Sequence, residues 1–226
     1  MNKQQGFTLI ELLIASSILM MIVLLGTYSY SLFADKWNKQ LGHVNEVVQQ
    51  VRTLTLLDQL LDGVVPLVLN DNNYKSFYFD GTETQLTAIS LNGIIRSAEP
   101  VVFRLSTETL INGSQRVWYE EAGLQNLLIL SEKQQLPFDA PLLLLENLAQ
   151  IQFSYFGWES FEVKSQAAFE NDISKGRVWF SNYNGQTRQL QPEKLSMKLQ
   201  FQQAQVNLHS RFTQNSEMLL RDFEGG

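Results

Sequence analysis

The chain has 226 residues and a net charge of −6, with 17 Lys and Arg against 23 Asp and Glu. This acidic balance without a basic cluster argues against nucleic acid as a partner, because phosphate contacts need clustered Lys and Arg. The absence of Cys excludes disulfides, thiolate metal sites and a Cys nucleophile, and 2 His are too few for a multi-histidine metal centre. The composition therefore predicts no metal and no cofactor.

The N-terminal segment has the length and composition of a membrane-spanning helix. Residues 7–25 read FTLIELLIASSILMMIVLL, and Glu11 is the only charged residue between Lys3 and Asp35. As a helix this run is about 28 Å long, close to the ~30 Å of a bilayer core. Lys3 favours an N-terminus that stays in the cytoplasm, with the rest of the chain on the other side.

A cleaved signal peptide and a simple uncleaved anchor are the alternatives for this segment. A signal peptide has a shorter apolar run, of about 7–15 residues, followed by a cleavage site of small residues. Here the small residues 15–17 fall inside the run, whereas Gly6 precedes it. Cleavage after Gly6 would remove a polar leader and leave the membrane helix attached to the mature chain.

Residues 6–15, GFTLIELLIA, resemble the leader junction of type IV pilins and type II secretion pseudopilins. The resemblance rests on Gly6, on Phe7 and on a lone Glu11 inside an apolar helix. It implies cleavage between Gly6 and Phe7 by the prepilin peptidase and N-methylation of Phe7. It also implies transfer of the subunit from the bacterial inner membrane into a helical filament built with a major pilin or pseudopilin.

Glu11 has a physical interpretation beside the family one. A charged carboxylate in hydrocarbon costs several kcal/mol unless it is paired or protonated. Cleavage after Gly6 would create an ammonium group on Phe7, and its pairing with Glu11, in one subunit or between neighbours, would set the axial register of assembly. The alternative is that Glu11 merely extends to the lipid headgroups.

We expect the helix to continue well beyond the membrane. Apolar residues recur at steps of three and four between residues 41 and 61, and no Pro occurs before Pro66. Asp62 and Gly63 followed by Pro66 form a helix stop signal. One helix over residues 7–61 is predicted, apolar all round in its first half and amphipathic in its second. The stripe expected to pack on the head and on neighbouring stems comprises Leu41, Val44, Val48, Val51, Leu54, Leu57 and Leu61.

From residue 75 the pattern changes to short apolar segments separated by turn signals, which predicts antiparallel sheets. Residues 76–80 and 86–90 are predicted to form a hairpin. Tyr155, Trp158 and Trp179 are predicted to lie in the core, because large aromatic residues dominate protein cores. Further strands are predicted at residues 101–105, 116–119, 127–130, 142–145, 151–156, 178–180, 195–201 and 206–212.

The expected fold class is therefore α+β, with a long N-terminal helix packed on a β-rich head. Residues 1–6 are the expected leader, and residues 7–34 the half of the helix that lies in the membrane or the filament core. Residues 35–62 are the amphipathic half, and residues 63–226 the head.

Two stretches of the head carry a second resemblance. Residues 144–155, LLENLAQIQFSY, are similar to a strand entry of the minor pseudopilin J family, and residues 190–199, LQPEKLSMKL, to its leucine–proline turn into a final strand. The W-type minor pilins of type IV pili share this layout. The resemblance implies assembly with other minor subunits, I- and K-like or their pilus counterparts, into a complex that primes polymerisation. The bulky head then suits the filament tip.

Catalytic motifs are not apparent. The sequence contains no phosphate-binding loop, zinc motif or GxSxG elbow, and His43 and His209 have no spaced carboxylate that suggests a triad. We therefore expect a non-enzymatic minor pilin or pseudopilin, anchored once in the bacterial inner membrane with its head in the periplasm. The alternative is a membrane-anchored periplasmic binding or enzymatic domain unrelated to filaments, which a pocket with convergent polar groups would favour.

Overall fold

The computed structural model describes residues 8–71, 74–97, 99–125, 127–131, 134–170, 176–202 and 204–212, apart from the side chains of residues 35, 38–46, 71 and 74. The chain forms two compact units, Met1–Val51 and Arg52–Gly226. The first unit holds most of the long helix, and the second holds the last three turns of that helix together with the strands. Each unit is described by itself.

Helix α1 runs from Leu9 to Asp62, close to the predicted residues 7–61. It ends where polar groups of the head satisfy its last carbonyl groups, which have no partner inside the helix. Ser90 Oγ donates to Leu60 O at 2.7 Å and Ser210 Oγ donates to Leu61 O at 2.9 Å. Both serines are buried. The helix end is thus fixed by strands that lie 30 and 149 residues further along the chain.

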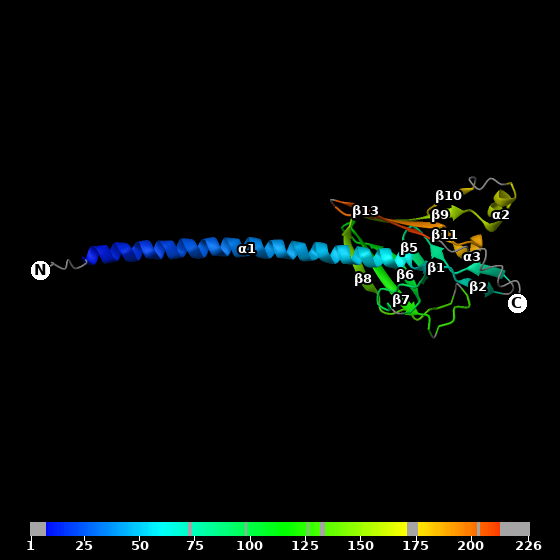
Figure 1. Cartoon of the computed structure of the whole chain (residues 1–226), viewed down its shortest axis with the longest axis horizontal. Coiled ribbons are helices and arrows are strands. Elements are labelled where there is room, and N and C mark those ends of the chain that lie inside the picture. The colour runs from blue at the N-terminus through cyan, green and yellow to red at the C-terminus, as the bar shows by residue number, and fades with distance from the viewer. Residues whose placement is uncertain are drawn as a thin grey trace. The chain divides into compact units, whose positions relative to one another are not determined.

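The larger sheet of the head has seven strands, all paired antiparallel (Figure 1). Its strand order is β11-β4-β5-β6-β7-β8, and β1 pairs with β5 beside this path. The bounds are β1 (Val64–Val65), β4 (Asp80–Gly81), β5 (Gln85–Ser90), β6 (Val101–Thr109), β7 (Gln115–Gly123), β8 (Leu142–Leu148) and β11 (Tyr183–Asn184).

A second antiparallel sheet has four strands in the order β10-β9-β12-β13. They are β9 (Gln150–Trp158), β10 (Arg177–Phe180), β12 (Lys194–Gln200) and β13 (Gln205–Arg211). A separate hairpin joins β2 (Val68–Asp71) to β3 (Tyr74–Phe77), and two short helices are α2 (Phe161–Phe169) and α3 (Gly185–Arg188). A long apolar helix followed by antiparallel sheets confirms the predicted α+β fold class.

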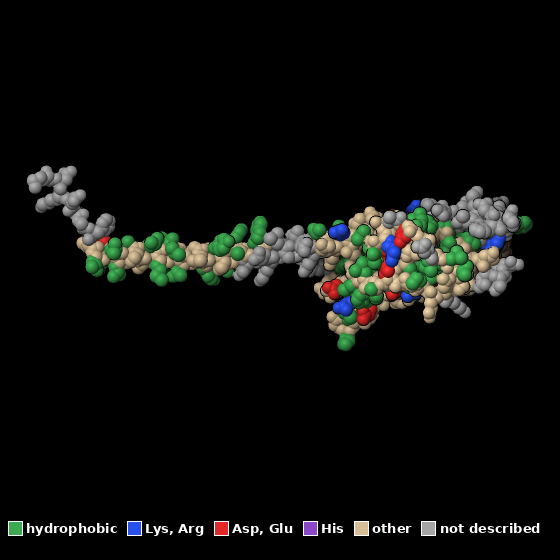
Figure 2. All heavy atoms as spheres, turned by 90° about the horizontal axis from the view of Figure 1, so that it is seen from below, with side chains coloured by type: hydrophobic (Ala, Val, Ile, Leu, Met, Phe, Trp, Pro, Cys, Tyr) green, Lys and Arg blue, Asp and Glu red, His purple; other side chains and the backbone are tan. Residues whose placement is uncertain are grey.

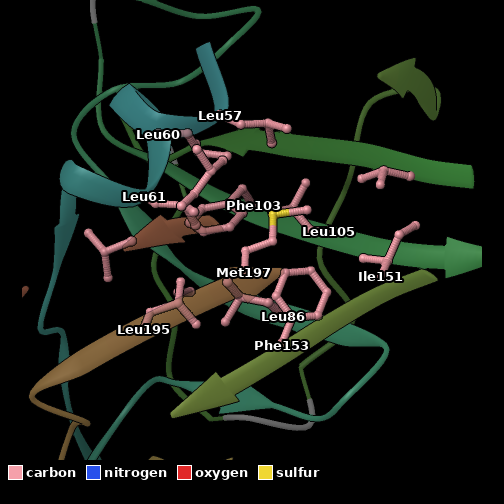
Figure 3. Close-up of a cluster of buried hydrophobic side chains, with 14 of the residues drawn as sticks. Leu57, Leu60, Leu61, Leu86, Phe103, Leu105, Ile151, Phe153, Leu195 and Met197 are labelled. Carbon is pink, nitrogen blue, oxygen red and sulfur yellow. The ribbon is translucent and has the colours of Figure 1, made fainter. Parts of the chain in front are cut away.

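The core of the head lies where α1 meets both sheets. Leu57, Leu60 and Leu61 are at most 1% exposed, and they point toward apolar side chains of β5, β6, β9 and β12 (Figure 3). Burying one such leucine contributes about 1.5–3 kcal/mol relative to leaving it in water. This burial explains why the last turns of α1 belong to the same compact unit as the strands.

The predicted hairpin of residues 76–80 and 86–90 is wrong in its first strand. Residues 74–77 form β3, which pairs with β2, and only Asp80 and Gly81 pair with β5. The chain bends between these strands, where Tyr78 N donates to Leu67 O at 2.9 Å. No strand was predicted at residues 68–71, and it is this strand, β2, that pairs with the apolar run through Phe77.

Two further predictions for the head are corrected. Residues 127–130 form no strand: Ile129 is buried against Ile89 and Val102 without joining a sheet. Of the three aromatic residues expected in the core, Tyr155 and Trp158 are buried, whereas Trp179 is 50% exposed. Trp179 lies on β10, which is an edge strand and has a neighbour on one side only.

A fully buried carboxylate holds the connection between β5 and β6. Glu121 on β7 accepts hydrogen bonds from the backbone N–H groups of Ile94 at 3.0 Å, Ile95 at 3.2 Å and Arg96 at 2.6 Å. The hydroxyl of Tyr119 donates to the same carboxylate. Burial raises the pKa of Tyr119, so this hydroxyl stays protonated and keeps its role as a donor.

The buried helix end predicts a large cost for Leu60→Ala. In a chain shortened to residues 35–226, this change should lower the free energy of unfolding by about 2–5 kcal/mol, because it leaves a cavity between the helix and the sheets. Val48→Ala is the matched control, since Val48 is 56% exposed and its loss should change stability by no more than about 0.5 kcal/mol. Urea denaturation followed by circular dichroism measures both. Equal effects of the two changes would contradict the packing described.

Candidate assembly site

The processing residues proposed from the sequence lie outside the described part of the chain. Gly6 and Phe7 precede Thr8, the first residue that the structure describes. The structure therefore describes only the residues that follow the processing junction, beginning at Thr8.

Glu11 closes a capping box at the start of α1. One carboxylate oxygen, Oε2, accepts hydrogen bonds from Thr8 N and Thr8 Oγ1, both at 3.0 Å. In return, Glu11 N donates to Thr8 Oγ1 at 3.4 Å. This reciprocal pattern of Thr at the N-cap and Glu three residues later satisfies backbone donors that the helix leaves unpaired. Glu11 therefore fixes the first turn of the helix in addition to any role between subunits.

This local role of Glu11 was not predicted, although the spacing of Thr8 and Glu11 indicates it. Thr8-Leu9-Ile10-Glu11 before an apolar run has the [ST]-x-x-[DE] spacing of a capping box. The interpretation of Glu11 as an isolated charge in hydrocarbon is incomplete, because the hydroxyl and backbone of Thr8 already solvate one of its oxygens. No described residue donates a hydrogen bond to the other oxygen, Oε1, of Glu11.

Residues Leu9–Ala34 form a helical segment long and apolar enough to cross a membrane. Every described side chain in its first 25 residues is exposed, and the hydrophobic side chains are distributed along the segment in Figure 2. Its serine hydroxyls donate to backbone carbonyls one turn back: Ser16 to Leu13 at 3.0 Å and Ser17 to Ile14 at 2.8 Å. Because these polar groups are satisfied within the helix, they suit an environment without water. The composition of this helix indicates anchoring in a membrane.

The stripe predicted on the second half of the helix divides into a buried and an exposed part. Leu57 and Leu61 are buried in the core of the head, and Leu54 packs against that core. Val48 and Val51 are each 56% exposed, and Val47 beside them is 44% exposed. The side chains of Leu41 and Val44 lie outside the described residues. Leu60, which is fully buried beside Leu57 and Leu61, was not included in the predicted stripe, although it follows Leu57 by a step of three.

The head has a polar pocket of about 100 Å³. Its polar lining comes mainly from Asp80, Gln85 and Thr87 of the large sheet, together with Arg104 and Gln134. Arg104 Nη1 also lies 3.4 Å from Glu120 Oε2. Ligand sites for drug-sized molecules usually enclose about 300–1,000 Å³, so this pocket fits a few water molecules or a very small ligand. Among the described residues, no three His, Asp or Glu side chains gather as metal ligands do.

The comparisons with known proteins identify the N-terminal segment. Residues 1–27 match the family model of the prokaryotic N-terminal methylation motif, which is a signal of the type IV pilin family. No curated protein and no solved structure matches the chain significantly. The N-terminus therefore carries a pilin-like processing signal, and residues 28–226 are interpreted from their own sequence and structure.

The capping box predicts different outcomes for two substitutions of Glu11. Glu11→Gln should keep the first turn intact, because Gln accepts the same hydrogen bond at this position. Glu11→Leu should release the Thr8 amide and speed its hydrogen exchange about fivefold, which corresponds to a cap of about 1 kcal/mol. The measurement is amide exchange by NMR on a peptide of residues 7–34 in detergent micelles. Unchanged exchange of Thr8 in the Leu variant would show that the capping box is not formed.

Proposed function

We propose that this chain is a minor pilin or pseudopilin, a structural subunit that primes or caps assembly of a type II secretion pseudopilus or a type IV pilus. The observation that carries the proposal is the methylation motif over residues 1–27, which lies directly on a long apolar helix. A simple membrane anchor needs the apolar helix but has no need of the junction at Gly6 and Phe7.

In this proposal the prepilin peptidase cuts between Gly6 and Phe7, and Phe7 is then N-methylated. The glycine suits the position before the cut because a residue without Cβ allows the backbone to approach the enzyme closely. The mature chain keeps its membrane helix, which holds the subunit in the bacterial inner membrane with its head in the periplasm. From there the subunit passes into the filament.

Glu11 serves the docking step in this mechanism. The capping box keeps its carboxylate at the start of the helix, one turn from the new N-terminus, with Oε2 held by Thr8. The ammonium group of Phe7, from the same or a neighbouring subunit, pairs with the carboxylate through Oε1. In a medium of low dielectric this pairing is strong and an unpaired charge is costly, so subunits dock where the two charges meet and the axial register is fixed.

The remainder of the stem and the head supply the other contacts. Val47, Val48 and Val51 form an exposed apolar face before the helix enters the head, which suits packing against the stems of other minor subunits or of the major subunit. The two stretches that resemble the J family contribute β9 and β12, which are adjacent strands of one sheet. The resemblance of these stretches to J- and W-type subunits implies I- and K-like partners for this chain. The bulky head fits the tip of the filament better than its repeating shaft.

The proposed role is structural and non-enzymatic. The polar pocket lined by Asp80 and Arg104 is small, at about 100 Å³. It therefore gives little support to the alternative of an anchored periplasmic enzyme or binding domain.

The processing step predicts the mature N-terminus. Mass spectrometry of the protein purified from membranes or filaments should find a chain that begins at Phe7 and carries one added methyl group on its α-amino nitrogen. Gly6→Val is the control, because a branched side chain at the scissile position should block cleavage and leave Met1 in place. A terminus after Ala15 or Ser17 would instead indicate an ordinary signal peptide and overturn the proposal.

The docking step predicts that Glu11→Gln fails in assembly even though it keeps the capping box. Gln removes the charge that the Phe7 ammonium needs, while it holds Thr8 as before. Gln carries no charge, so its insertion into the membrane should cost no more than that of the carboxylate, and processing and membrane level should persist. Complementation of a deletion strain, scored for processing, membrane level and filament or secretion output, tests this. Full output from processed Glu11→Gln would show that the charge is dispensable and that Glu11 acts only as a cap.

A further inference from the structure

The four-stranded sheet has an outer face that differs in composition from the rest of the protein. Along β9, β12 and β13, alternate residues such as Phe153, Leu195 and Met197 are buried in the core, so the residues between them lie on the opposite face. Besides Ser, Gln, Asn and His, this outer face carries Phe156, Arg177, Trp179, Lys194, Lys198 and Arg211, and at its end Trp158 is buried against Ala167 of α2.

No acidic residue occurs in any strand of this sheet. β9, β10, β12 and β13 contain no Asp or Glu, although the chain has 23 of them and a net charge of −6. The large sheet is different: Glu108, Glu120 and Glu146 lie on its strands, and Arg104 and Arg116 pair with two of them. The four-stranded sheet therefore concentrates positive charge within an acidic protein.

Arg177 on β10 pairs with Glu193, with 3.4 Å between Nη1 and Oε2, whereas the sheet's other three cations have no such counter-charge among the described residues. Lys194 on β12 is directly opposite Arg211 on β13, a like-charge pair that destabilises a sheet by itself. Neither of them, nor Lys198, forms an ion pair with any residue that the structure describes. A cationic face that is unfavourable within the fold has a clear use if an anionic partner covers it.

Aromatic rings continue the same row across the sheet. The register places Trp179 opposite Phe156 and Phe156 opposite Lys194, so that Trp179, Phe156, Lys194 and Arg211 form one line over four strands. The ring centroids of Trp179 and Phe156 are 5.4 Å apart, and Lys194 Nζ lies 4.9 Å from the centroid of Phe156. Trp179 remains 50% exposed at the end of the row, where one face of its ring system can take a stacking partner.

We propose that this outer face is a binding site for single-stranded nucleic acid. Proteins that bind single strands combine cations that follow the phosphate backbone with aromatic rings on which bases stack. Here Lys194 and Lys198 lie on one strand, about 13 Å apart, and Trp179 lies two strands, or about 10 Å, from Lys194. The strand backbone passes over the lysines and Arg211, a base stacks on Trp179, and the amide and hydroxyl side chains between them bond to base edges.

The composition of the face favours this ligand over an acidic protein. Protein interfaces have an apolar centre and are depleted of Lys, whereas the outward positions of β9, β12 and β13 hold no aliphatic residue. The net charge of −6 repels a polyanion at long range, so binding is weak and local, within a Debye length of about 8 Å at physiological salt. The expectation against nucleic acid was based on the net charge of the whole chain, which does not show that cations gather on one sheet.

The test uses the full chain in detergent and a fluorescein-labelled oligo(dT) of about 20 nucleotides, followed by fluorescence anisotropy. The oligonucleotide should bind at low salt, and the affinity should fall as the salt concentration rises. The expected slope of log K against log salt is about −2, because three phosphates are neutralised. Lys194→Glu with Lys198→Glu should weaken binding about tenfold or more. Lys75→Glu, on β3 outside this sheet, is the matched control and should change the affinity no more than about twofold.

A second variant separates stacking from charge. Trp179→Ala should weaken binding at least about fivefold and abolish the quenching of tryptophan fluorescence by oligo(dT), and Trp179→Phe should restore part of the affinity. If the double Glu variant unfolds by circular dichroism, the milder Lys194→Gln with Lys198→Gln takes its place. Absence of binding at low salt, or equal losses in the Lys75 control, would overturn the proposal. Equal competition by polyglutamate, or tighter binding of polygalacturonate, would also overturn it, because neither offers a base.

Discussion

The apolar surface of one long helix is the constraint on which the rest of the structure depends. Over Leu9–Ala34 the hydrophobic side chains cover every side of the helix and are exposed in the isolated chain, so lipid or other subunits have to cover them. At Leu57, Leu60 and Leu61 the same helix completes the core of the head. Thr8 and Glu11 close its first turn, and Ser90 and Ser210 close its last. Processing signal, anchor and head are thus joined by one continuous element with both ends satisfied.

Periodicity predicted this helix almost to its ends because its signals are local: a long apolar run, steps of three and four, and a stop at Gly63. The predicted stripe did not include Leu60, although Leu60 follows Leu57 by a step of three. Local sequence patterns also predicted most of the strands, but they did not predict which strands pair. Phe77 has its partner in β2, and Ile129 is buried outside any sheet, and neither follows from the apolar pattern alone.

The polar features also fall into those set by neighbouring residues in the sequence and those set by distant ones. The capping box of Thr8 and Glu11 lies within four residues and could have been recognised from its spacing. Glu121, in contrast, has backbone partners at residues 94–96, about which the type of residue 121 gives no information. The cationic sheet face could not be recognised either, because Lys194, Lys198 and Arg211 become neighbours only through the register of β12 and β13. Whole-chain charge described the average, whereas the fold determines where charge is displayed.

The hydrogen bond from Ser210 to the end of the helix has a consequence for the order in which the head can fold. The leucines at the end of α1 stay exposed until β12 and β13 have been synthesised, because these strands supply Leu195, Met197 and Leu208. Contacts of such long sequence separation form slowly, on about the millisecond to second scale. Closure of the head therefore requires nearly all of the described chain. Without β13, the apolar end of the helix would lack Leu208 and the hydrogen bond from Ser210.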